Sequence, residues 1–421
     1  MYLVESIVNR VYRRKMTAFL HMDEIPGLDR SPHPDAGDYL LYVHVPFCES
    51  LCPYCSFHRC EFEESLASRY FDAVWREFQL YKDLGFDFKA MYVGGGTPTI
   101  MIRKLTETLD RARTLFGIRE ISVETNPNHL IPDNLTRLKE AGVNRLSVGV
   151  QSFNDHILQQ IGRLQRYGHA ADIKARLAKA VGVFDTLNID FIFNIPSQTD
   201  DMLLGDLAAI DELLPEQVTF YPLMTAPSVE SVLKKSLGSI DYAKEKRQYF
   251  IILEGMRKHY TTSTAWCFSR KSTMIDEYII DYDHYVGIGS GAFGFFNDAL
   301  HINTFSIPEY LEKISRNKLP VTRLKRFSPK EKQYYFLLRK LFGITLATDQ
   351  FRSGLDLEGD CHIRPALKAL RWAGAFAESN GSVTLTERGQ YYWVMAMREF
   401  FIAVDTLRDQ CRNGGAATHA T

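Results

Sequence analysis

The sequence has no long apolar run and almost no net charge. No apolar stretch approaches the ~20 residues that a membrane-spanning helix needs, and the first residues lack the pattern of a secretory signal peptide. Lysine and arginine together number 50 and aspartate and glutamate 51, which gives a formal net charge of -1. That balance disfavours a protein that binds nucleic acid by neutralising many phosphates, and it disfavours a charged, disordered chain. We therefore expect a cytoplasmic globular protein that does not bind nucleic acid.

Cysteine is also scarce, and its distribution matters more than its number. Seven cysteines in 421 residues are few for a secreted disulfide scaffold of this size. Four of them lie close together in the sequence, namely Cys48, Cys52, Cys55 and Cys60. The other three are scattered, at Cys267, Cys361 and Cys411. Clustered cysteines in a reducing compartment indicate a metal site or a catalytic thiol.

Composition and pattern divide the chain into four parts. Hydrophobic residues make up 45% of it, and its length corresponds to two or three domains of about 150 residues. We predict a basic amphipathic helix and a proline-containing linker over residues 1–38 and an α/β domain over 39–323. A small, mainly helical domain, winged-helix-like in shape, follows over 324–411, and a disordered tail covers 412–421. The helical domain begins with a capping box of Ser328 and Glu331 and contains a strand pair near Ser382–Leu385.

The α/β domain alternates apolar strands with helices. The predicted strands cover residues 40–45, 90–93, 119–124, 145–151, 187–193 and 218–222. The predicted helices cover residues 62–83, 102–116, 132–141, 154–161, 168–181 and 200–213. Crossovers of this length imply parallel strands, arranged either as an open doubly wound sheet or as a barrel. In both arrangements the active site lies at the carboxyl ends of the strands, where this chain places its cysteines, a glycine run, Glu124 and Gln151.

The spacing Cys48-x3-Cys52-x2-Cys55 is the strongest signal in the sequence. Thiolates are soft ligands that suit iron–sulfur clusters or zinc, but a structural zinc site normally has four ligands in two separated pairs. Three closely spaced cysteines can hold a four-iron cluster and leave one iron open for a substrate or cofactor. We expect Cys60 to lie outside the cluster, because a fourth thiolate would close that iron. His44 precedes the cysteines on a strand, where we expect it to be hydrogen-bonded in the core.

The segment from Tyr42 to Cys55, Tyr-Val-His-Val-Pro-Phe-Cys-x3-Cys-Pro-Tyr-Cys, resembles the signature of the radical S-adenosylmethionine (SAM) superfamily. Its first half is similar to that of the oxygen-independent coproporphyrinogen III dehydrogenase branch, and the resemblance extends from about residue 38 to about residue 410. It implies a partial (β/α)6 TIM-like barrel with a small helical C-terminal domain. It also implies a [4Fe–4S] cluster with SAM at its open iron, and a flavodoxin- or ferredoxin-type electron donor. Cleavage of that SAM would give a 5′-deoxyadenosyl radical.

The resemblance further implies two SAM sites, with residues matched by motif. Positions around the cluster-bound SAM correspond to Tyr42, Gly95, Glu124 and Phe293. Positions around a second SAM correspond to Tyr54, Gly96, Thr97, Gln151, Arg163 and Asp190. The residue types suit these roles, because glycine lets the backbone approach a ligand closely and arginine can bind a carboxylate through two hydrogen bonds. Alone, each residue could instead be part of a turn, a helix cap or a structural charge; together, in chain order, they indicate a site.

Sequence differences between this chain and members of that branch reduce the number of functions that we consider. The decarboxylases of the branch continue past the third cysteine with Gly-Cys-Asn, where this chain has Ser56-Phe57-His58, and the haem chaperones carry a His-Asn-x-x-Tyr-Trp motif that is missing here. These differences favour the class C radical SAM methyltransferases. In that family the adenosyl radical takes a hydrogen from the methyl group of a second SAM, and the resulting radical adds to an sp² carbon of a conjugated substrate. Porphyrinogen decarboxylation, other tetrapyrrole chemistry and haem chaperone activity are the alternatives.

The N-terminal helix gives one hint about the substrate. Its apolar face and its basic residues suit a membrane surface, and these basic residues are Arg10, Arg13, Arg14 and Lys15. Docking of the helix on the barrel is the simpler alternative. Because a lipid quinone is reached from the membrane, we expect menaquinone as substrate, tetrapyrrole chemistry as second choice, and peripheral contact with the inner face of the membrane. Candidates for an apolar lining of the mouth are Tyr221, Phe295 and Phe296.

Overall fold

The computed structural model of the chain describes residues 12–28, 32–271 and 278–412. Its central feature is one curved sheet of 13 strands, in the order β1-β15-β14-β13-β12-β2-β5-β6-β7-β8-β9-β11-β10. Six neighbouring strands in its middle are parallel: β2 (Tyr39–Val45), β5 (Ala90–Gly95), β6 (Glu120–Thr125), β7 (Arg145–Gln151), β8 (Thr186–Phe193) and β9 (Gln217–Pro222). Most of their residues are buried, as is typical of parallel strands covered on both faces. The α/β prediction is confirmed, and β7 has the predicted bounds.

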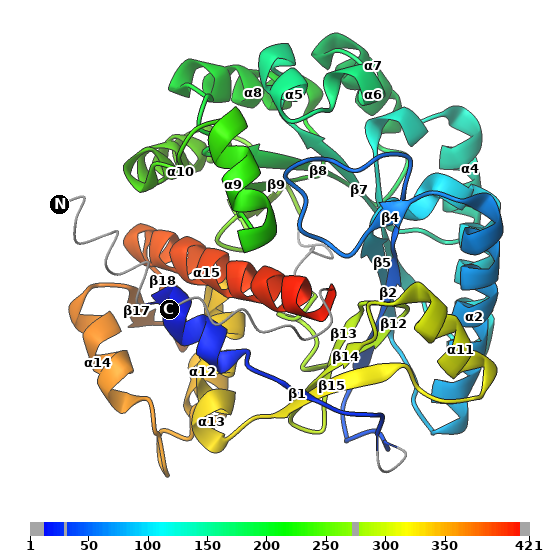
Figure 1. Cartoon of the computed structure of the whole chain (residues 1–421). Coiled ribbons are helices and arrows are strands. Elements are labelled where there is room, and N and C mark those ends of the chain that lie inside the picture. Colours follow the sequence, from blue (N-terminus) through cyan, green and yellow to red (C-terminus); the bar gives the residue numbers. More distant parts are fainter. Residues whose placement is uncertain (1–11, 29–31, 272–277, 413–421) are drawn as a thin grey trace.

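Helices connect these strands across the outer face of the sheet (Figure 1). They are α2 (Glu64–Asp83), α3 (Ile102–Phe116), α4 (Pro132–Glu140), α5 (Asp155–Gln160), α6 (Leu164–Tyr167), α7 (Ala170–Ala180) and α8 (Asp200–Leu213). Two 3₁₀ turns, η1 (Pro98–Met101) and η2 (Pro127–His129), start directly after β5 and β6. Beyond β9 the chain forms α9 (Pro227–Ser236) and α10 (Tyr242–Met256). The carboxyl ends of the parallel strands therefore lie together at one end of the sheet.

The sheet continues on both sides and does not close. Next to β2 lies β12 (His284–Ile288), followed by the antiparallel strands β13 (Phe293–Phe296), β14 (Ala299–Asn303), β15 (Val321–Arg326) and β1 (Asp23–Glu24). Next to β9 lie β11 (Cys267–Ser269) and β10 (Thr261–Thr262), and α11 (Ile307–Ser315) packs on α2. The barrel is thus partial, as expected. Glu24, predicted to lie in the linker, instead belongs to the sheet because it pairs with β15.

The C-terminal part is mainly helical and shares the core of the sheet. It contains α12 (Pro329–Phe342), α13 (Thr348–Gly354), α14 (Arg364–Trp372), α15 (Glu387–Arg412) and a small sheet of β16 (Thr345–Ala347), β17 (Phe376–Ser379) and β18 (Ser382–Leu385). The predicted capping box of Ser328 and Glu331 is present. Trp266, beside β11, packs edge-on against Phe342 of α12. In Figure 1, α15 crosses the open side of the partial barrel, and it includes Arg412, which we had wrongly placed in a disordered tail.

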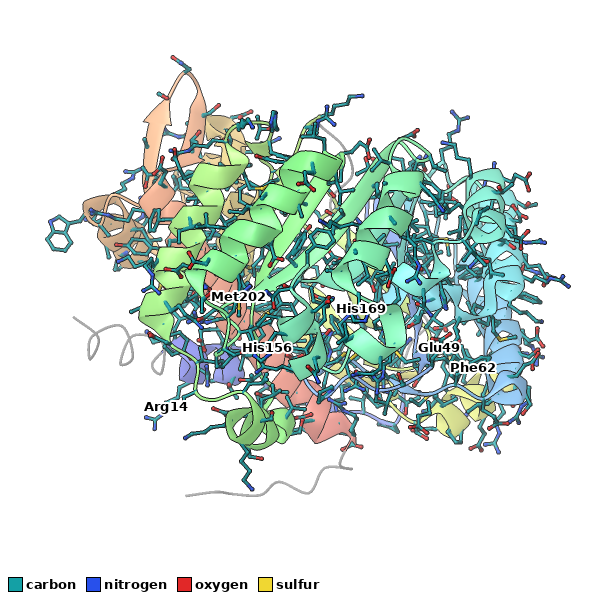
Figure 2. The ribbon with its side chains drawn as sticks, turned by 90° about the horizontal axis from the view of Figure 1, so that it is seen from above. Arg14, Glu49, Phe62, His156, His169 and Met202 are labelled. Carbon is teal, nitrogen blue, oxygen red and sulfur yellow. The ribbon has the colours of Figure 1, made fainter. Side chains whose placement is uncertain are left out.

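The described part of the N-terminal helix, residues 12–19, docks on the protein. The Phe19 ring lies 5.0 Å from that of Phe327, and Arg13 Nε donates to Glu399 Oε2 of α15 at 2.7 Å. Arg14 is exposed and projects outward in Figure 2. Arg10 and most of the expected apolar face lie outside the described residues. Among the helices that the structure describes, none has the length and apolar character required to cross a bilayer.

Candidate active site

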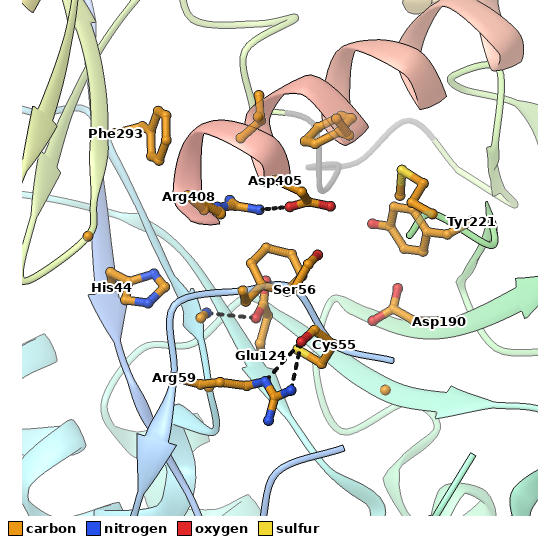
Figure 3. A pocket seen from close by; sticks show the side chains of 18 of the residues that line it. His44, Cys55, Ser56, Arg59, Glu124, Asp190, Tyr221, Phe293, Asp405 and Arg408 are labelled. Atoms are coloured by element: carbon orange, nitrogen blue, oxygen red, sulfur yellow. Dashed lines mark hydrogen bonds and ion pairs between the residues drawn. The ribbon is translucent and has the colours of Figure 1, made fainter. Parts of the chain in front are cut away.

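A cavity of about 380 Å³ lies at the carboxyl ends of the parallel strands, beneath α15. Every residue predicted for the cluster and for the two SAM sites lines it: Tyr42, Cys48, Cys52, Tyr54, Cys55, Gly95, Gly96, Thr97, Glu124, Gln151, Arg163, Asp190 and Phe293. Figure 3 shows how carboxylates from the strands and charged side chains from α15 face one another across the cysteine segment. The motifs, far apart in sequence, therefore share one space, while their individual roles stay predictions.

The cysteines lie on a loop that is closed at its base. Two short parallel strands, β3 (Phe47–Cys48) and β4 (Cys60–Glu61), bring the loop ends together, with Cys60 N donating to Pro46 O at 2.7 Å. The Arg59 guanidinium donates through Nη2 to the carbonyl oxygen of Cys55 at 2.7 Å (Figure 3) and to that of Cys52 at 2.6 Å. Arg59 thereby holds the loop in a fixed shape. Cys60 lies in β4 and is not among the residues that line the cavity.

The surroundings of the thiols fit an iron–sulfur cluster. Thr97 Oγ1 points at Cys48 Sγ over 3.7 Å, and Arg163 and Arg166 point at Cys52 Sγ over 3.8 and 3.9 Å. Donors aimed at sulfur are typical of cluster sites, where they stabilise anionic ligands. Burial raises the pKa of the Cys48 thiol to about 11, so a thiolate there needs a cation such as iron.

A single metal ion fits less well. Among the described residues, no three His, Cys, Asp or Glu side chains are placed to hold one ion together. A four-iron cluster binds each thiolate at a different iron and spreads the ligands apart, so three thiols along one cavity wall suit it better. This arrangement favours the cluster over zinc.

Glycines at the end of β5 allow Glu124 and the cysteine loop to approach the backbone. Glu124 Oε2 accepts from Gly95 N at 3.0 Å, and Glu124 Oε1 accepts from the Tyr92 hydroxyl at 2.8 Å. A Cβ on Gly94 would fall 2.6 Å from Glu124 Oε1, and one on Gly96 would fall 2.6 Å from the carbonyl oxygen of Phe47. The backbone excludes a side chain at Gly96, and a side chain at Gly94 would displace the Glu124 carboxylate, so the glycine run is more than a turn.

Arg163 and Asp190 are two further polar residues that line the cavity, and Arg163 contacts Tyr54. Arg163 donates to Asn126 Oδ1 at 3.0 Å, to the Tyr54 hydroxyl at 3.3 Å and to the carbonyl of Gly149. Burial alone would lower the pKa of Arg163, but the neighbouring Tyr54 and Cys52 raise it, so the guanidinium is charged. Asp190 accepts from Ser147 and Asn188, side chains of β7 and β8 respectively. The cavity therefore has a second polar wall in addition to Glu124, made of Tyr54, Gln151, Arg163 and Asp190.

Hydrogen bonds define the protonation of His44 and the direction of the Tyr42 hydroxyl. His44 Nε2 lies 2.8 Å from the carbonyl oxygen of His58, which can only accept, so Nε2 carries the hydrogen. His44 Nδ1 must then accept from the Tyr42 hydroxyl at 2.9 Å. Burial lowers the pKa of His44 to about 4, which keeps the ring neutral. His44 is hydrogen-bonded as expected, and it leaves the Tyr42 oxygen as an acceptor toward the cavity.

The apolar lining was predicted only in part. Tyr221 lines the cavity, but Phe295 and Phe296 do not. Phe295 packs against Phe327 and Tyr335, and the Phe296 ring stacks on that of His301 with 4.0 Å between the ring centroids, although Phe293 of the same strand does line the cavity. Aromatic residues that line the cavity but were missed include Phe57, Trp266, Tyr278, Phe400 and Phe401. Phe57 could have been noticed as an apolar residue two positions after the last cysteine of the motif, whereas the others carry no local signal.

Three charged residues of the site were also missed. They are Arg59 on the cysteine loop and Asp405 and Arg408 on α15. Arg59 lies four residues after Cys55, and a cationic side chain so close to clustered cysteines could have been predicted to belong to the site. Asp405 and Arg408 could not be assigned, because their place over the cavity depends on how α15 docks.

Comparisons with known proteins identify the same region, most of the parallel strands and the cysteine loop, as similar to a known superfamily. The model of the radical SAM superfamily matches residues 42–210. The heme chaperone HemW of Bacillus subtilis (strain 168) is 28% identical over 366 residues, covering 83% of this chain and 95% of the relative. HemW of Escherichia coli (strain K12) is 30% identical over 274 residues, covering 60% of this chain and 69% of the relative.

Two further proteins extend this picture. The oxygen-independent coproporphyrinogen III oxidase of Salmonella typhimurium is 30% identical over 209 residues, which are 46% of this chain and 44% of the relative. The solved structure of coproporphyrinogen III oxidase (HemN) from Escherichia coli, a radical SAM enzyme, superimposes with a TM-score of 0.71 at 21% identity over 90% of this chain and 95% of that one. This last likeness shows the fold. The names of these four proteins refer to heme or coproporphyrinogen, and not to methyl transfer or quinones.

Proposed function

Because the chain belongs to the radical SAM superfamily, and within it to the branch of HemW and the oxygen-independent coproporphyrinogen III oxidases, we propose that it is a radical SAM enzyme acting on a tetrapyrrole. This proposal takes the place of menaquinone as the leading substrate, because the relatives favour tetrapyrroles. One observation supports it above all. The three thiols, the two polar walls and a set of aromatic side chains line the same cavity.

In this proposal, each group of residues that lines the cavity has a defined role. Cys48, Cys52 and Cys55 would hold a [4Fe–4S] cluster, and this group would supply the one electron that splits SAM into methionine and a 5′-deoxyadenosyl radical. Glu124 and the backbone of Gly95 orient the SAM bound there. The aromatic walls exclude water and accommodate a flat conjugated ring. A flavodoxin- or ferredoxin-type protein supplies the electron.

Anaerobic reconstitution tests this function. The chain is loaded with iron, sulfide and SAM, and SAM cleavage is measured with and without coproporphyrinogen III or haem. We expect cleavage to depend on a tetrapyrrole, and Cys52→Ala to abolish both the visible cluster absorbance and turnover. Cys60→Ala is the matched control and keeps both, because Cys60 lies outside the cavity. Tight haem binding without any SAM cleavage would assign the chain to the chaperones and refute the enzymatic function.

Methylation of an sp² carbon by a second SAM is the second candidate. The observation that favours it is the second polar wall of Tyr54, Gln151, Arg163 and Asp190, which faces the same cavity as Glu124. A conjugated quinone such as menaquinone would then be a substrate. SAM labelled in its methyl group distinguishes the two candidates, since only methylation transfers the label to the product.

A further inference from the structure

Helix α15 brings one ion pair into the cavity. Arg408 Nη1 donates to Asp405 Oδ1 at 2.7 Å, and their side chains are only 12% and 4% exposed. Both residues line the cavity, and Figure 3 shows them pointing from α15 toward the cysteine segment. Burying charges is costly, and a helix that only covers the cavity would not need them.

The ion pair is fixed to the cysteine loop as well as to α15. The Ser56 hydroxyl donates to the Asp405 carboxylate, and Arg412 Nη2, one turn further along α15, donates to the carbonyl oxygen of Ser56 at 3.0 Å. The guanidinium of Arg408 lies 4.7 Å from the centroid of the Phe57 ring. Ser56 and Phe57 directly follow the third cysteine, so the position of Arg408 is set relative to the cluster loop.

Arg408 has hydrogen-bond donors left over. Among the described residues, Asp405 is its one hydrogen-bond partner, and none of its nitrogens is a buried atom lacking a partner. Its remaining N–H groups are therefore accessible, and the residue lines the cavity. Arg163 and Arg59, by contrast, direct several N–H groups at protein oxygens. The rings of Phe57 and Phe293, 4.7 and 5.5 Å away, hold the guanidinium in place.

We propose that Arg408 determines substrate specificity by binding an oxygen at the edge of a flat conjugated substrate. A planar guanidinium with two free N–H groups recognises a carboxylate in a bidentate manner and a carbonyl through one bond. Substrate carboxylates of a tetrapyrrole and the ring carbonyls of a quinone share this chemistry. With that oxygen held by Arg408, which packs on Phe57 two residues after Cys55, the substrate ring lies in the cavity beside the cysteine loop. The inference rests on the proposed function, which supplies the conjugated substrate.

Ligand binding to the reconstituted full chain tests the assignment. The ligands are protoporphyrin IX, which has two carboxylates, its dimethyl ester, and 2-methyl-1,4-naphthoquinone, with Kd measured anaerobically by quenching of tryptophan fluorescence. We expect the wild type to prefer the diacid over the diester by about 10- to 100-fold, the range for a hydrogen bond to a charged group. Arg408→Gln should abolish the preference, and Arg408→Lys, which keeps the charge without the planar fork, should retain part of it. Arg412→Gln is the matched control, because Arg412 clamps Ser56 but does not line the cavity.

The outcomes separate this assignment from the proposed function. If only the quinone binds and Arg408→Gln weakens it at least tenfold, Arg408 keeps its role and the tetrapyrrole proposal fails. If Arg408→Gln and Arg408→Lys bind every ligand as the wild type does, the assignment of Arg408 is wrong while the tetrapyrrole proposal stands. Equal losses in Arg412→Gln and Arg408→Gln would show that the helix position matters and would overturn direct contact. A wild type that binds none of the ligands would refute both proposals.

Discussion

Replacing Arg398 should destabilise the protein far more than replacing Arg13, although both contact Glu399. Arg398 lies on α15 with 1% of its side chain exposed, and it donates to Glu245 of α10 and, through Nε and Nη2, to Glu399 at 3.1 and 3.0 Å. Arg13 reaches Glu399 from the N-terminal helix, and its side chain is 34% exposed. Burial alone would lower the pKa of Arg398, but the charges of Glu245 and Glu399 raise it. These four residues form the charged junction between α10, α15 and the N-terminal helix.

The structure gives the expected magnitudes. Arg398→Met leaves two buried carboxylates, of which Glu399 keeps its ion pair with Arg13 and Glu245 keeps only neutral partners among the described residues. Removing one partner of a buried pair costs about 3–5 kcal/mol. Arg13→Met leaves Glu399 bound to Arg398, and water screens the half-exposed partner, so a loss of about 1 kcal/mol or less is expected. The double variant Glu245→Leu with Arg398→Met removes one of the orphaned carboxylates and should recover part of the loss.

Urea unfolding followed by tryptophan fluorescence measures these differences, since urea, unlike guanidinium, does not screen charges. Transition midpoints are compared at constant slope, so that a shift reports stability and not a change in the exposed surface. The reasoning fails if Arg398→Met loses less than Arg13→Met. It also fails if the double variant is less stable than Arg398→Met alone, since the single variant would then owe its loss to packing and not to uncompensated charge.

Two other substitutions have equally definite outcomes. Gly96→Ala should reduce the iron bound per chain several-fold, because its Cβ would lie 3.0 Å from Cys48 Sγ. The control is Gly205→Ala in α8, where no atom lies within 4 Å of the new Cβ. This control should bind iron like the wild type, and its free energy of unfolding should rise by up to about 1 kcal/mol. Equal iron contents in the two variants would contradict this. Burial raises the pKa of Glu77 to about 8 from its ordinary 4.5. The contribution of the protonated Glu77 to the free energy of unfolding is therefore complete below pH 4.5. It falls by up to about 1.4 kcal/mol per pH unit as the pH rises toward 8. Urea unfolding from pH 5 to 9 should show this decline in the wild type but not in Glu77→Gln, and parallel curves would exclude Glu77 as the cause.

The parallel half of the fold could be predicted because its signal is local. Buried parallel strands appear as short apolar runs, and the helices between them carry their own periodicity, so β7 was predicted with its observed bounds. The site followed from the same regularity, since residues at successive strand ends must meet at one end of the sheet.

The rest depends on contacts between distant parts of the chain. Phe295 and Phe296 are as apolar as Tyr221, but neither reaches the cavity surface, because other aromatic side chains cover Phe295 and Phe296 stacks on His301. Arg408 is about 350 residues from the cysteine loop and reaches it because α15 packs across the open side of the barrel. Helix periodicity shows that α15 has an apolar face, but not which polar residues of that helix meet a cavity.

An open sheet differs from a closed barrel in having two edges, and exposed edge strands are sites where chains associate. Here the outermost strands, β1 and β10, are only two residues long. The β1 strand consists of Asp23 and Glu24, both exposed, so a second chain aligning there would meet adjacent negative charges. A sheet that does not close keeps both edges, and these short, polar edge strands make pairing with the sheet of a second molecule unfavourable.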